Sequence, residues 1–139
     1  MPSATKERVI VDTNCWISFL IGRRLHRLVD LLSDESIQLV ICDELLDEIK
    51  DVTSRSKFSK YFPPKEVDSL LEFLRLIGEN YNPIQSVHLC RDKSDDYLLA
   101  LAIESKARYI VTGDLDLLAL NKLGNCEIVT VDAFEQIIQ

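Results

Sequence analysis

Short apolar runs alternate with longer segments of helical periodicity along this chain, and this alternation limits the possible folds more than any other feature. Strand-like runs lie at 8–12, 37–41, 83–87 (the weakest), 108–112 and 127–131. Apolar residues recur at helical spacing in 13–32 with a break at Gly22, in 43–52, from Pro63-Pro64 to Gly78, in 95–106 and in 115–121. Strands separated by helices pair in parallel through right-handed crossovers. We therefore expect an α/β fold, a three-layer α/β/α sandwich around a mostly parallel sheet of about five strands.

Length and composition are those of one compact unit. The chain has 139 residues, 47% of them hydrophobic, which is enough to close one core, so we expect a single domain over residues 1–139. No stretch approaches the roughly 20 apolar residues of a membrane span, and the first residues lack the apolar segment of a secretion signal. We expect a cytoplasmic protein without a membrane partner. The four cysteines are far apart and form no Cys-x-x-Cys pair, which favours reduced, buried thiols over a zinc site.

Acidic residues stand where strands end. Asp12 follows the run Val9-Ile10-Val11, and Asp114 follows the strand-like run at 108–112. The carboxyl ends of parallel strands meet at one edge of the sheet, where open α/β folds place their chemistry. Glu48, inside a helical segment, and Asp96, in the first turn of another, could reach the same edge.

Carboxylates gathered at one place favour a bound cation. They repel one another unless a cation supplies compensating charge. Hard cations such as Mg²⁺ or Mn²⁺ prefer these oxygen ligands, and they can activate a water for displacement at a phosphodiester. The residues therefore predict a metal site built by Asp12, Glu48, Asp96 and Asp114.

Several of these acids have another role or a close competitor. Asp12, followed by Thr13 and Asn14, could cap the next helix. Glu44 competes with Glu48, and Asp92 and Asp95 compete with Asp96. Asp116 could cap the next helix, or it could lie near the metal together with Asp114. The residue pattern alone leaves these choices open.

Four segments, taken together, resemble a PIN domain. They are VIVDTN at 9–14, ELLDEI at 44–49, DKSDDYLLALA at 92–102 and IVTGDLDLL at 110–118, and the resemblance runs from Val9 to about Phe134. It implies a metal-dependent ribonuclease in which Asp12, Glu48, Asp96 and Asp114 hold Mg²⁺ or Mn²⁺, with Asp116 as an additional acid and Asn14 and Thr112 as polar support. This compact form resembles the toxin subunits of prokaryotic toxin-antitoxin pairs. The resemblance therefore also implies an RNA substrate, a small antitoxin partner and a homodimer or higher homo-oligomer.

Charge is unevenly distributed in a chain whose net charge is −7. An acidic protein is a poor non-specific binder of nucleic acid, because phosphate contacts need cations. Two basic stretches stand out, at 23–27 and at 53–65, and the second mixes its cations with aromatic residues. Such a mixture suits single-stranded nucleic acid, so Arg55, Lys57 and Lys60 are candidate RNA contacts. The alternative is a solvated turn whose aromatic residues pack into the core.

Two other functional classes fit parts of this pattern. An aspartyl-phosphate phosphatase also places an acid after its first strand, but it usually has a second acid two residues later, where this chain has Asn14. A non-catalytic PIN-like module that binds RNA or protein, or a receiver-like switch domain, needs no complete set of acids. The intact set of four acids favours the nuclease.

Overall fold

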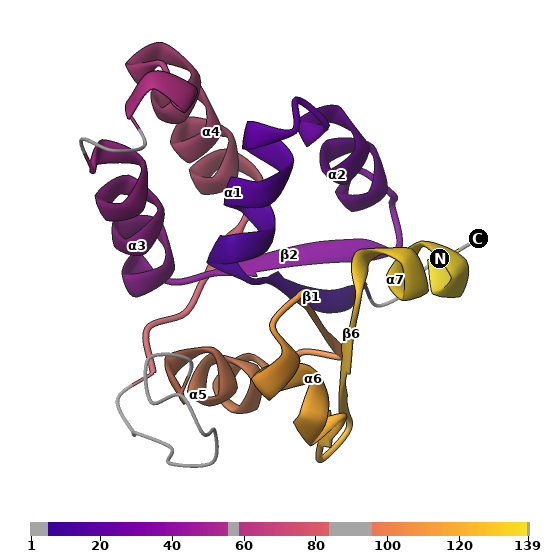
Figure 1. Cartoon of the computed structure of the whole chain (residues 1–139). Helices are drawn as coiled ribbons and strands as arrows, with labels where there is room; N and C mark the ends of the chain where they lie inside the picture. Colours follow the sequence, from indigo (N-terminus) through magenta and orange to yellow (C-terminus); the bar gives the residue numbers. More distant parts are fainter. Residues whose placement is uncertain (1–5, 56–58, 84–95, 139) are drawn as a thin grey trace.

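The computed structural model describes residues 6–55, 59–83 and 96–138, which build a six-stranded sheet between two layers of helices (Figure 1). The strand order is β3-β2-β1-β4-β6-β5, and all neighbours pair in parallel except β5 and β6. The strands are β1 Glu7–Val11, β2 Ile37–Ile41, β3 Glu79–Asn80, β4 Tyr109–Val111, β5 Lys122–Leu123 and β6 Cys126–Val129.

The helices cover both faces of this sheet, which confirms the predicted α/β/α architecture. They are α1 Thr13–Ile21, α2 Leu25–Leu32, α3 Asp43–Ser54, α4 Pro64–Ile77, α5 Asp96–Ser105, α6 Leu115–Leu120 and α7 Val131–Ile138, with a short 3₁₀ turn at Ser59–Tyr61. In Figure 1, α1 to α4 lie above β1 and β2, while α5 and α6 lie below. None of the helices in the described ranges is long and apolar enough to cross a membrane.

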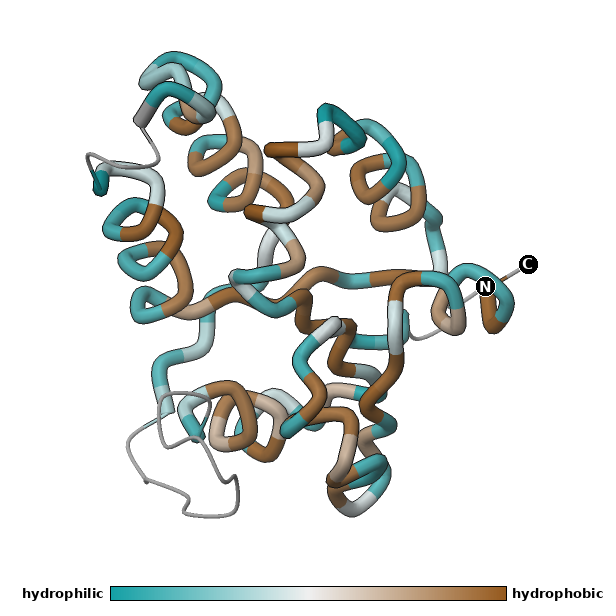
Figure 2. Tube along the Cα trace, in the orientation of Figure 1, coloured by the Kyte–Doolittle hydropathy of each residue, from teal (hydrophilic) through white to brown (hydrophobic). Residues whose placement is uncertain are grey.

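The central strands are buried on both faces. Val9, Ile10, Ile110 and Val111 have no more than 1% of their surface exposed, as expected for parallel strands covered by helices. Figure 2 shows the same pattern, with hydrophobic residues along the strands and on the helix faces turned toward them. Trp16 lies in this core. The predicted buried thiols are found at Cys15, Cys42 and Cys126, whereas Cys90 lies outside the described residues.

The carboxyl-terminal part of the fold differs from the sequence-based expectation. The strand predicted at 127–131 ends at Val129, and the chain turns into α7, a helix that the pattern did not predict. Thr130 starts this helix, because its hydroxyl oxygen accepts from the Ala133 N–H at 3.1 Å. Phe134 then packs edge-on against Tyr109, with 5.8 Å between the ring centroids. Phe134 is the one fully buried residue of this helix, so its position depends on tertiary contacts more than on local sequence pattern.

Two strands, β3 and β5, were not predicted. Each has only two residues, too few to show a period in the sequence. The strand predicted at 83–87 lies outside the described residues except for Pro83, which belongs to no helix or strand.

Gly78 brings the end of α4 close to β2. A Cβ at this position would lie 2.6 Å from the carbonyl oxygen of Leu74 and 2.9 Å from side-chain carbons of Ile41. Such distances are too short for any residue but glycine, so the helix ends against the sheet and leads directly into β3.

Candidate active site

The candidate site lies at the carboxyl ends of the two central strands. From β1 the sheet continues to β2 on one side and to β4 on the other, so the direction of the crossovers changes between β1 and β4. Open α/β sheets form a crevice at such a point. Asp12 directly follows β1, and its N–H donates to the carbonyl oxygen of Val111 in β4 at 2.9 Å. Asp12 and the residues after β4 therefore lie side by side at this edge of the sheet.

Asp12 is a buried carboxylate with few hydrogen-bond donors. Only 1% of its surface is exposed. The Thr112 hydroxyl donates to its Oδ2 at 2.8 Å, and the Asn14 N–H approaches Oδ1 at 3.4 Å. Burial raises the pKa of Asp12, the two hydrogen bonds oppose this, and the negative charges of Glu48 and Asp114 raise the pKa further. Among the described residues, no positive charge compensates the ionised form of Asp12.

Thr112 joins the two strand-end acids through one hydroxyl group. It donates to Asp12 and accepts from the Asp114 N–H at 3.0 Å. Asp114 in turn caps α6, because its Oδ1 accepts from the backbone N–H groups of Asp116 at 2.7 Å and Leu117 at 3.3 Å. Of the two acids in this loop, Asp114 is thus the cap, and Asp116 lies in the first turn of α6.

Glu48 is held by a tyrosine that sequence reasoning missed. The Tyr97 hydroxyl donates to Glu48 Oε1 at 2.7 Å and lies 3.2 Å from Thr13 Oγ1. Burial raises the pKa of Tyr97 well above its ordinary value, and the neighbouring Glu48 adds to the effect, so this hydroxyl stays protonated. The charge of Glu48 also acts on Asp12, which distinguishes Glu48 from the competing Glu44 in the same helix. The only sequence signal for Tyr97 was its position next to Asp96.

Asp96 opens α5 and has 8% of its surface exposed. Its competitors Asp92 and Asp95 lie outside the described residues, so the structure does not compare the three. Among the residues that the structure describes, no three His, Cys, Asp or Glu side chains are arranged to hold one metal ion together.

The donor atoms suit a hard cation nevertheless. Asp12, Glu48 and Asp114 offer carboxylate oxygens, and the charges of Glu48 and Asp114 both act on Asp12. Magnesium commonly takes only one or two protein carboxylates and completes its shell with water and phosphate oxygens. A buried carboxylate with a raised pKa is the kind of group that such an ion would stabilise.

A cavity of about 380 Å³ opens beside Asp114. Asn14 and Ser18 line it from α1, and Gly113 from the loop after β4. A Cβ at Gly113 would meet no atom within 4 Å, so this wall of the cavity is open. A substrate group larger than water can therefore lie next to Asp114.

The candidate RNA contacts have different environments. Arg55 pairs with Asp51 at 3.1 Å, Lys60 lies 5.0 Å from the ring of Tyr61, and Lys57 is outside the described residues. Phe62 is buried in the core, whereas Tyr61 has 49% of its surface exposed. Of the described aromatic residues of this stretch, Phe62 thus packs into the core and Tyr61 is exposed, and RNA contact by this stretch stays a prediction.

Comparison with known proteins agrees with this α/β architecture around a mostly parallel sheet. The chain matches the PIN domain family over residues 8–116. It is also similar to an uncharacterized protein of Methanocaldococcus jannaschii, with 32% identity over 118 residues that cover 83% of this chain and 76% of that protein. The chain belongs to the PIN domain family, as its motifs predicted. PIN domains are generally nucleases and typically use divalent metals.

Proposed function

We propose that this protein is an endoribonuclease that depends on Mg²⁺ or Mn²⁺ and hydrolyses phosphodiester bonds of RNA. The observation that carries the proposal is the buried Asp12 carboxylate, whose charge faces those of Glu48 and Asp114 at the switch point of the sheet. Burying a carboxylate near other negative charges lowers the stability of the fold, and such arrangements cluster at functional sites.

The protein's residues would bind and orient the metal ion, and none of them would attack the phosphodiester. Asp12, Glu48, Asp96 and Asp114 would hold the ion, with Asp116 as a further acid at the rim. When bound, a divalent ion lowers the pKa of an attacking water and stabilises the leaving oxygen. Thr112 keeps Asp12 and the Asp114 loop together, and Tyr97 fixes the carboxylate of Glu48. Since water is the nucleophile, no side chain needs to form a covalent bond with the substrate.

Cleavage of an end-labelled single-stranded RNA by metal-stripped protein tests this proposal. We expect no cleavage in excess chelator, recovery on addition of Mg²⁺ or Mn²⁺, and loss of activity in Asp12→Asn with an unchanged circular dichroism spectrum. Full cleavage in chelator would reject the proposal. So would products ending in a 2′,3′-cyclic phosphate, because they would mean that the 2′-hydroxyl, not water, attacks. RNA binding without any cleavage would favour the alternative, a non-catalytic RNA-binding module.

The resemblance to toxin subunits supports a finer proposal. The protein would be the toxin of a toxin-antitoxin pair, acting in the cytoplasm, with an antitoxin as protein partner and a homodimer or higher homo-oligomer as its assembly. Induced expression should then stop growth, and Asp12→Asn should relieve the arrest. Light scattering of the purified protein measures the oligomer, and a monomer at micromolar concentration would contradict that part of the proposal.

A further inference from the structure

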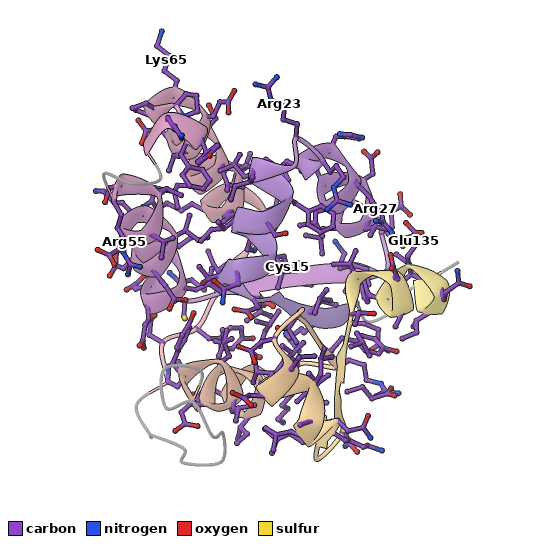
Figure 3. All side chains as sticks on the ribbon, viewed as in Figure 1. Cys15, Arg23, Arg27, Arg55, Lys65 and Glu135 are labelled. Carbon is purple, nitrogen blue, oxygen red and sulfur yellow. The ribbon has the colours of Figure 1, made fainter. Side chains whose placement is uncertain are left out.

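The two basic stretches of the sequence form the walls of one cavity. This cavity, which we call the basic pocket, has a volume of about 730 Å³ and lies between the α1–α2 region and the start of α4. Arg23 and His26 line it from one side, and Lys60 and Lys65 from the other. Figure 3 shows Arg23 and Lys65 at the same end of the molecule.

Three other cations of these stretches, Arg24, Arg27 and Arg55, are engaged elsewhere. Arg27 pairs with Asp132 at 2.8 Å and with Glu135 at 3.3 Å, joining α2 to α7 (Figure 3). The Arg24 guanidinium lies 4.8 Å from the centre of the Phe19 ring, and Arg55 is paired with Asp51.

In the part of the chain that the structure describes, the cations of the pocket itself have no acidic ion-pair partner. Within 6–55, 59–83 and 96–138, Arg23, Lys60 and Lys65 form no ion pair, and Glu66 is the one acid among the lining residues. The pocket is thus a basic site on a protein whose net charge is −7, and it suits an anionic ligand.

The pocket also offers surfaces on which a base can stack. Tyr61 has 49% of its surface exposed and Ile21 has 46%, and both line the pocket together with Phe73. The Lys60 ammonium lies over the Tyr61 ring, 5.0 Å from its centroid, so a cation covers one face of the ring. Aromatic faces flanked by cations are how proteins hold single-stranded nucleic acid.

One exposed stripe of α1 leads from the acids to this pocket. Asn14, Ser18 and Ile21 are the exposed residues of this helix, and their spacing places them on one face. Asn14 and Ser18 line the cavity beside Asp114, and Ile21 lines the basic pocket. At about 1.5 Å per residue the helix spans about 13 Å, or about four stacked nucleotides at about 3.4 Å each.

From this geometry we propose that the basic pocket binds the single-stranded RNA being cut, at about four nucleotides from the scissile phosphate. Phosphates contact Arg23, Lys60 and Lys65, and a base stacks on Tyr61. The inference rests on the proposed nuclease function and adds the form of its substrate. RNA is favoured over an acidic peptide because the stripe on α1 joins the pocket to the candidate catalytic acids.

The test compares Lys60→Gln/Lys65→Gln with the matched control Lys106→Gln/Lys122→Gln, which removes the same charge from exposed positions that do not line the pocket. Binding of a labelled RNA of about twelve nucleotides is measured in the Asp12→Asn background over a range of salt concentrations. Loss of two phosphate contacts should weaken binding and lower the slope of log K against log salt by about 1.4. Tyr61→Ala should weaken binding on the order of tenfold without that change in slope. The control should behave like the parent protein.

Cleavage kinetics distinguish a failure of the proposed pocket from a failure of the proposed nuclease function. With Asp12 intact, the pocket variant should raise KM for the long RNA, leave kcat unchanged, and cut a fragment of about three nucleotides like the wild type, because the fragment cannot span the two sites. Equal RNA binding by pocket and control variants would overturn the proposal. If the lysine substitutions weakened the binding of an acidic peptide and left RNA binding unaffected, the proposal would be overturned in favour of a protein partner. Lysine-dependent RNA binding without cleavage would support the pocket and reject the nuclease.

Discussion

The hydroxyl of Tyr97 donates a 2.7 Å hydrogen bond to Oε1 of Glu48 and so links α5 to α3 across the candidate site. Because burial and the neighbouring Glu48 keep Tyr97 protonated, its hydroxyl remains a donor that orients this carboxylate. Tyr97→Phe keeps the ring but removes the donor. Groups that orient metal ligands commonly contribute a factor of about 10–100 in metal affinity or activity, and we expect a loss of that size.

Titration of RNA cleavage with Mn²⁺ measures the effect of Tyr97→Phe. The variant should need more Mn²⁺ for half-maximal rate while its thermal unfolding changes little. Tyr109→Phe is the matched control, since it removes a hydroxyl from β4 at a ring that packs on Phe134. Identical Mn²⁺ dependence in both variants would show that the hydrogen bond has no role in the site.

Asp12→Asn should stabilise the metal-free protein. A carboxyl whose pKa is raised on folding opposes folding once it ionises, so its cost appears above the ordinary Asp pKa of about 4 and is complete above the folded pKa. Asparagine avoids this cost and can still accept from Thr112. We expect the free energy of unfolding to rise by about 0.5–2 kcal/mol at neutral pH, since substitutions that remove a functional group often stabilise the fold.

Urea unfolding in chelator, at several pH values, tests this expectation for Asp12→Asn. The two proteins should have equal stability at the acid end and diverge as the pH rises. A variant less stable than the wild type at neutral pH would show that the buried carboxylate stabilises the fold and carries no functional cost.

Thr112 should be the most sensitive polar residue of the site. Its hydroxyl is fully buried, donates to Asp12 and accepts from the Asp114 N–H. Thr112→Val leaves both partners unsatisfied and should lower the free energy of unfolding by about 1–3 kcal/mol, whereas Thr112→Ser keeps the hydroxyl and should restore most of it. Chemical denaturation of the two variants measures these free energies of unfolding. Equal losses of stability in both variants would assign the effect to packing alone.

The sequence predicted the parts of the fold that have strong local patterns. The runs around Val9, Ile37 and Ile110 became β1, β2 and β4, because continuous β-branched residues favour buried parallel strands. The helix α7 was missed, since only Phe134 is buried there and its partner Tyr109 is distant in sequence. Short elements that depend on such contacts leave little periodicity to read.

In the candidate site too, residues with a local sequence pattern could be predicted, and those that depend on packing could not. Asp12 and Asp114 could be proposed from their positions after strands, because parallel strands end at one edge. The role of Tyr97 depends on how α5 packs beside α1 and α3, which no local pattern specifies. Likewise the two basic stretches were visible separately, but their meeting at one pocket is a property of the fold.

Calorimetric titration of Mn²⁺ into metal-stripped protein tests the central claim most directly, because it measures binding to the acids without requiring cleavage. We predict saturable binding by the wild type and binding weakened beyond detection in Asp12→Asn, with Lys106→Gln/Lys122→Gln unchanged. Equal Mn²⁺ binding by the wild type and Asp12→Asn would contradict the account, since the buried acid at the switch point would then hold no metal.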